Sequence, residues 1–130
     1  MESEIVHFEI PAKDPKKLSA FYSKCFGWKF EDAGMQGMKY WIITTSAKAK
    51  WKGGMYKKGK SSQVPVNYIG TKNIDATMKS IKKAGGSILM GKQEIPHMGW
   101  SAMTKDPEGN VLGLFQPSMG MPKQTKSKRK

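Results

Sequence analysis

The chain has 130 residues, of which 38% are hydrophobic and 10% aromatic, a composition typical of one globular domain with a sizeable core. Collagen-like, disulfide-stapled and wholly disordered proteins are excluded by this composition and by the single cysteine, Cys25, which we expect to be a packed thiol. The sequence contains no run of about 18 apolar residues, so no membrane-spanning helix is predicted. The N-terminus has no signal-like pattern, so the sequence predicts a cytoplasmic protein.

The formal net charge is +13, from 23 basic and 10 acidic residues, and it is unevenly distributed. Five basic residues fall in 118–130, which we expect to be a disordered tail after a domain at 1–117. A second excess lies between Ala33 and Ile74, where there are eight lysines and no acid. This basic middle is either a solvated surface or a region that attracts phosphate or carboxylate groups.

The first half of the chain reads as a strand, a helix and three further strands. Alternation predicts a strand at 4–11, with His7 and Glu9 on the same face. Asp14 is suited to the N-cap of the helix that follows, and Gly27 to its left-handed end. Three short strands are then expected at 28–32, 38–45 and 52–57.

The second half repeats this order at an offset of 59 residues without a gap. Asp14 matches Asn73, since 14 + 59 = 73, and Trp41 matches Trp100, since 41 + 59 = 100. A second helix is therefore expected to begin after Asn73 and to stop at the Gly85-Gly86 pair. The segment 58–65 joins the halves, and the strands of the second half are predicted at 66–71, 87–92, 99–105 and 110–116.

Four motifs carry a resemblance to a known family: His7-Phe8-Glu9-Ile10-Pro11, Ala20-Phe21-Tyr22-Ser23-Lys24-Cys25-Phe26-Gly27-Trp28, Ala84-Gly85-Gly86 and Lys105-Asp106-Pro107-Glu108-Gly109-Asn110. Over about residues 4–117 the chain resembles the vicinal oxygen chelate superfamily, which includes glyoxalase I, bleomycin-resistance proteins and extradiol dioxygenases. The resemblance implies an α+β fold. Two βαβββ modules, at about 4–57 and 66–117, are expected to form an incomplete, cup-shaped β-barrel.

The resemblance also bears on metal binding. Metal-dependent relatives hold a divalent ion through ligands on the first and fourth strands of each module. These positions map onto His7, Gly54, Val66 and Gly113, and His7 is the single metal ligand among them. We therefore expect no metal and no other cofactor. The two glycines are expected to enlarge the cup.

The cup is the expected ligand site. His7 and Glu9 are the candidate catalytic acid and base, although His7 is equally readable as an inert histidine bonded to a neighbour. Aromatic residues on the expected cup faces are equally readable as core. The candidate ligand-binding residues are Trp41, Gly54, Tyr68, Trp100, Gly113 and Phe115.

Three functions follow from these observations. The favoured one is a metal-free, homodimeric small-molecule-binding protein of the glyoxalase and bleomycin-resistance type, whose ligand is expected to be anionic because the chain is basic. The second is a metal-independent isomerase, lyase or epimerase that uses His7 and Glu9. The third is a binder of nucleic acid or of an acidic partner through the Lys-rich middle and tail, which is disfavoured because Arg129 is the single arginine.

Overall fold

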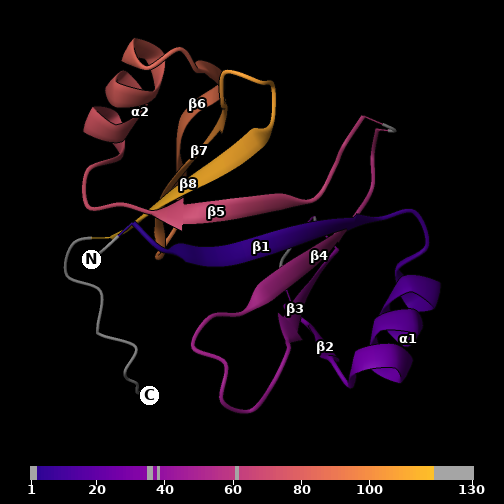
Figure 1. Cartoon of the computed structure of the whole chain (residues 1–130). Helices are drawn as coiled ribbons and strands as arrows, with labels where there is room; N and C mark the ends of the chain where they lie inside the picture. The colour runs from indigo at the N-terminus through magenta and orange to yellow at the C-terminus, as the bar shows by residue number, and fades with distance from the viewer. Residues whose placement is uncertain (1–2, 35–36, 38, 61, 119–130) are drawn as a thin grey trace. The chain divides into compact units, whose positions relative to one another are not determined.

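The computed structural model describes residues 3–34, 37, 39–60 and 62–118, which form eight strands and two helices (Figure 1). The chain divides into two compact units, Ile5–Asn67 and Tyr68–Lys130 together with Met1–Glu4. Each unit contains one βαβββ module, and the boundary falls within the strand that opens the second module. The expected tail after Ser118 lies outside the described residues.

The first module is a four-stranded mixed sheet with one helix. Its strands lie in the order β2-β3-β4-β1, in which β1 runs parallel to β4 and the other neighbours are antiparallel. The elements are β1 (Ile5–Ala12), α1 (Pro15–Phe26), β2 (Lys29–Asp32), β3 (Tyr40–Thr44) and β4 (Gly53–Lys57).

The second module repeats this plan, with the strands in the order β5-β8-β7-β6. Its helix begins 59 residues after the first, as the repeat predicts. The α+β class and the two βαβββ modules are confirmed. The elements are β5 (Val66–Gly70), α2 (Ile74–Lys83), β6 (Ser87–Ile95), β7 (Gly99–Lys105) and β8 (Val111–Pro117).

The helix caps are those that the sequence predicts. The Asp14 carboxylate accepts from the Lys17 backbone N–H at 3.2 Å, and Gly27 ends α1 with a left-handed φ of 74°. The Asn73 side chain accepts from the Ala76 N–H at 3.0 Å at the start of α2. Local polar chemistry therefore fixes where both helices begin.

Each module has its own apolar core between helix and sheet. The buried residues are Ala12, Ile43 and Met55 in the first module and Ile74, Ala102 and Leu114 in the second. No helix in the described part of the chain is long and apolar enough to cross a membrane.

The expected packing of Cys25 is wrong, because this residue is exposed. The side of α1 that faces the sheet runs through Pro15, Leu18 and Tyr22, which are half-buried. Tyr22 stacks on Trp28 with the ring centroids 5.0 Å apart, and Cys25 lies one turn beyond this contact. The sheet-facing side of the helix therefore ends before the thiol.

The third strands of the two modules differ in register by two residues. Trp41 on β3 lies opposite Met55 on β4, whereas Trp100 on β7 lies opposite Gln116 on β8. The residue 59 positions after Met55 is Leu114, and its partner is Ala102. The structural counterpart of Trp41 is therefore Ala102, which corrects the expected equivalence of the two tryptophans. A shift of two residues keeps the same face of the sheet, so the gapless repeat gives no sign of it.

Candidate functional site

Strand β1 places its polar side chains on the face that the helix does not cover. Phe8, Ile10 and Ala12 belong to the core cluster between the sheet and α1. Because side chains alternate along a strand, His7 and Glu9 lie on the opposite face. Their Nε2 and Oε2 atoms are 3.9 Å apart, and the side chains are 29% and 22% exposed, so both remain within reach of a ligand.

A tyrosine that the sequence did not single out joins these two residues. The Tyr40 hydroxyl lies 2.8 Å from His7 Nε2 and donates to Glu9 Oε2 at 2.8 Å. Tyr40 is 8% exposed, so this hydroxyl is held in a largely desolvated position. We call His7, Tyr40 and Glu9 the β1 triad. Alternation along β3 places Tyr40 on the other face of the strand from Trp41 and Ile43, and this pattern could have indicated Tyr40 as a site residue.

Gly54 makes room for the tyrosine. It pairs with Glu9 on β1 and with Ile42 on β3, so it lies directly beside the triad. A Cβ atom added to Gly54 would overlap the Tyr40 hydroxyl and the ring carbon that bears it. The expectation that Gly54 enlarges a cavity is therefore wrong, because Tyr40 fills the space above it.

Hydrogen bonding and burial determine the protonation of the triad. The Tyr40 hydroxyl donates to Glu9 Oε2 and lies within hydrogen-bond distance of His7 Nε2, whose role as donor or acceptor depends on the tautomer of the imidazole. Burial lowers the pKa of His7, while the charge of Glu9 and a hydrogen bond with the Lys52 backbone oppose this effect. The Tyr40 hydroxyl thus connects the imidazole and the carboxylate through two hydrogen bonds.

The Glu9 carboxylate also affects a second tyrosine, Tyr56. The pKa of Tyr56 is raised by burial and by the negative charge of Glu9. Tyr56 pairs with Tyr40 across β3 and β4, so the two residues lie opposite each other in the sheet. Near neutral pH this phenol stays protonated and is available as a hydrogen-bond donor.

The second module has a related arrangement without the acid and base. The Tyr68 ring covers Gly113 so closely that an added Cβ would overlap it, and the Tyr68 hydroxyl lies 3.6 Å from Met103 Sδ. Leu114 belongs to the core, so alternation sets Gly113 and Phe115 together on the other face. Three of the expected ligand-binding residues, Tyr68, Gly113 and Phe115, thus share one face of this sheet.

Trp41 and Trp100 each lie on the helix-covered face of their sheet. Trp41 packs against the cluster of Ala12, Ile43 and Met55, and Trp100 packs against that of Ile74, Ala102 and Leu114. The structure therefore separates Trp41 from the β1 triad and Trp100 from Tyr68 by the thickness of a sheet.

The residues at the expected metal position do not fit a divalent ion. The Tyr40 hydroxyl already lies between His7 and Glu9, where an ion bound by both side chains would have to sit. Within the described ranges, no three His, Cys, Asp or Glu side chains come close enough together to hold a metal. The residues at this position form a hydrogen-bonded triad.

Two βαβββ modules are the architecture that the resemblance to the vicinal oxygen chelate superfamily implies. The model of the Glyoxalase/Bleomycin resistance protein/Dioxygenase superfamily matches residues 4–114. The chain belongs to this superfamily.

Two relatives agree with this assignment. A "Glyoxylase-like domain-containing protein" of Didymella fabae is 28% identical over 122 residues, covering 88% of this chain and 94% of that protein. The "Putative glyoxylase CFP32" of Mycobacterium bovis is 25% identical over 113 residues, covering 83% of this chain. The chain spans 43% of the length of this mycobacterial relative.

Solved structures share the fold at low sequence identity. A hypothetical protein from Bacillus halodurans has a TM-score of 0.68 at 14% identity, covering 94% of this chain and 99% of its own. The methylmalonyl-CoA epimerase of Mycobacterium tuberculosis has a TM-score of 0.64 at 13% identity, covering 98% of this chain and 96% of its own. At these identities the similarity concerns the fold alone.

Proposed function

We propose that the chain binds a small oxygenated molecule at the β1 triad and that it does so without a divalent metal. The observation that carries this proposal is the Tyr40 hydroxyl, bonded at 2.8 Å to both His7 and Glu9. Family members that use a metal bind vicinal oxygens through the ion, whereas here a donor and an acceptor stand together on the same face. Hydroxyl and carbonyl oxygens are the groups that such a pair recognises.

The expected ligand is anionic, and the charge of the chain supports this part of the proposal. A formal charge of +13 attracts anions over a long range and increases their local concentration at the surface. Glu9 itself repels an anionic group at short range, so the carboxylate of a ligand is expected to point away from Glu9, toward His7 or Tyr56. We expect the protein to work as a homodimer, as the family resemblance implies, and to be cytoplasmic.

A metal-independent isomerase, lyase or epimerase is the second candidate. The observation that favours it is the continuous hydrogen-bonded path from His7 through Tyr40 to Glu9. Glu9 as a base would take a proton from a carbon next to a carbonyl group, and the electron pair would move to the carbonyl oxygen. His7 in its protonated form would then donate a proton to the carbon of the resulting enolate, and the proton on Glu9 would return to His7 through the Tyr40 hydroxyl, so the cycle needs no oxidant or reductant.

The test is an NMR screen of the full chain with malonate, methylmalonate, lactate and pyruvate as probes. Binding at the triad should give saturable shifts of the His7 ring and Tyr40 signals, and the double variant His7→Ala/Glu9→Gln should weaken binding at least tenfold. Probes that shift no signal from His7, Glu9, Tyr40 or Tyr56, or that bind the double variant equally well, would contradict the proposal. Exchange of the pyruvate methyl protons for solvent deuterium, lost in the double variant, would favour the enzyme over the binding protein.

A further inference from the structure

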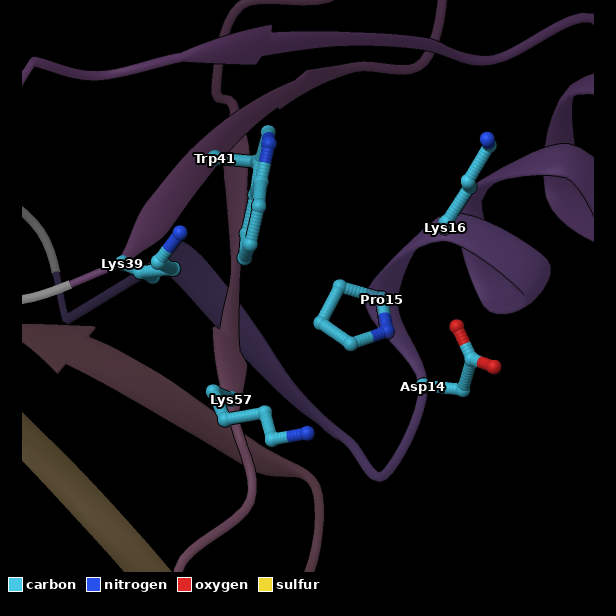
Figure 2. Close-up of a pocket in the computed structure, with 6 residues that line it drawn as sticks. All are labelled: Asp14, Pro15, Lys16, Lys39, Trp41 and Lys57. Atoms are coloured by element: carbon cyan, nitrogen blue, oxygen red, sulfur yellow. The ribbon is translucent and has the colours of Figure 1, made fainter.

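A pocket of about 640 Å³ opens on the helix-covered side of the first module, between the start of α1 and β3 (Figure 2). This volume is within the range of about 300–1,000 Å³ that holds small molecules in proteins. Because Trp41 and the triad lie on opposite faces of the sheet, the pocket is separate from the β1 triad. It is lined by Asp14, Pro15, Lys16, Lys39, Trp41 and Lys57.

Two flat apolar side chains form opposite walls of this pocket. Trp41 is half-buried, because part of it packs on the cluster of Ala12, Ile43 and Met55 while the rest lines the pocket. Figure 2 shows the indole edge-on, with one face turned across the pocket toward the Pro15 ring. A planar ring placed between them would be in contact with apolar surface on both sides.

The rim of the pocket is positively charged. Three lysines and one aspartate line it, which gives 3 − 1 = +2. The Asp14 carboxylate is already engaged as the N-cap of α1, through the Lys17 N–H. The Lys57 ammonium donates to the Lys13 carbonyl at 3.0 Å, which fixes this charge near the end of β1. An anionic group on a ring held by Trp41 would therefore meet three lysines and one carboxylate, which leaves the lining net positive.

The second module shows what the same place looks like when it is closed. Its helix begins with Ile74, which is fully buried and packs with Ala102, the counterpart of Trp41. Gln116, 59 positions after Lys57, accepts from the Ile74 backbone N–H at 2.7 Å and joins the helix to the sheet. In the first module Pro15 has no N–H to donate, and Lys57 bonds elsewhere. The open pocket is thus particular to the first module.

The charged residues near the two helix starts also differ between the modules. At the second position of each helix the first module has Lys16 and the second has Asp75, which forms an ion pair with Lys92 at 3.0 Å. The Lys92 ammonium in turn lies 4.7 Å from the centre of the Trp100 ring. The second module satisfies its cation and its indole internally, whereas the first presents lysines and an indole to an open pocket.

We propose that this pocket is a second binding site, which takes a small planar ring bearing a phosphate or carboxylate group. The ring lies between Trp41 and Pro15, and the anionic group is held by Lys39 and Lys57. The site is independent of the β1 triad and of the function proposed for it.

Phenyl phosphate is the probe for the test, with inorganic phosphate for comparison, and the readout is the indole N–H signal of Trp41 in the full chain, assigned by its loss in Trp41→Phe. Phenyl phosphate should give a saturable shift of this signal and should bind more tightly than inorganic phosphate. The exposed double substitution Lys39→Gln/Lys57→Gln should weaken binding by about tenfold, because charge-assisted hydrogen bonds are lost.

Two matched variants serve as controls. Lys79→Gln/Lys82→Gln on α2 removes the same charge outside the pocket, and His7→Ala/Glu9→Gln disables the triad; both should keep the affinity for phenyl phosphate. The proposal is overturned if the Trp41 signal does not move, if the Lys39/Lys57 variant binds as tightly as the wild type, or if inorganic phosphate binds equally well. Loss of binding in the triad variant would show that the two sites are one.

Discussion

The two modules share one plan and differ in what they leave available. Both place a tyrosine ring over a strand glycine, Tyr40 over Gly54 and Tyr68 over Gly113. In the first module that tyrosine joins an acid and a base, and on the other face of the sheet the helix start leaves a pocket. In the second, the helix start is sealed by Ile74 and Gln116. The repeat therefore preserves the backbone, while the polar chemistry is concentrated in the first copy.

The largest expected effect concerns the two helix starts. Ile74→Ala removes a fully buried side chain and should lower the free energy of unfolding by about 2–4 kcal/mol. Pro15→Ala, at the same place in the first module, should change it by less than about 1 kcal/mol, because Pro15 lines a pocket. Urea denaturation of both variants makes the comparison. Equal losses would mean that the two helix starts are packed alike.

The strand glycines provide the next test. Gly54→Ala would force a Cβ into the Tyr40 hydroxyl, so it should cost about 1–3 kcal/mol and disturb the His7 and Glu9 signals. The matched control is Gly91→Ala on β6, where an added Cβ meets nothing within 4 Å. That change should stay within about 0.5 kcal/mol. A harmless Gly54→Ala would show that Tyr40 is not held above this glycine.

Tyr40→Phe sharpens the difference by removing the hydroxyl alone. It deletes hydrogen bonds to His7 and Glu9 while keeping the ring, and the expected loss of unfolding free energy is about 1–2 kcal/mol. The NMR titration of His7 should change at the same time. Tyr22→Phe, on α1 and away from the triad, is the control for removing a phenol. An unchanged His7 titration in Tyr40→Phe would show that the Tyr40 hydroxyl does not affect the pKa of His7.

The smallest effect is the pH dependence that His7 gives to the stability of the first module. The pKa of His7 is lowered below its ordinary value of 6.5, chiefly by burial. Between these two values the unfolded chain binds more protons than the folded one, so the free energy of unfolding should fall as the pH is lowered through this window. Above the ordinary value the contribution of His7 should be constant.

Denaturation of wild type, His7→Gln and His97→Asn between about pH 7.5 and 5 measures this contribution. His7→Gln should reduce the dependence on pH, and His97→Asn is the control at an exposed position. If both variants keep the slope of the wild type, His7 is not a group whose pKa folding lowers.

Much of the fold follows from local sequence. The caps Asp14 and Asn73, the left-handed Gly27 and strand alternation place the elements to within two residues, except that β6 extends three residues beyond its predicted end. These signals depend on the chemistry of one residue and its near neighbours. The shared face of His7 and Glu9 follows in the same way.

The position of the Tyr40 hydroxyl and the presence of the pocket depend on pairing between strands that are distant in the sequence. Local sequence patterns do not predict the register of such pairing. Tyr40 lies 31 residues after Glu9, and the register of β3 on β4 brings its hydroxyl to the carboxylate. A two-residue difference in register separates Trp41 from Trp100 although the repeat aligns them. The Tyr40 ring covers Gly54 because it extends from β3 across to β4, and this contact is likewise not predictable from local sequence.

The most direct test of the central claim, that a tyrosine hydroxyl takes the place of a metal between His7 and Glu9, is the metal content of the tag-free protein. Cells are grown with added zinc, nickel and iron, and the dialysed protein is measured by elemental analysis and native mass spectrometry. The account predicts far less than one ion per chain and the same content in Tyr40→Phe. One tightly held ion per chain, lost in His7→Ala, would contradict it.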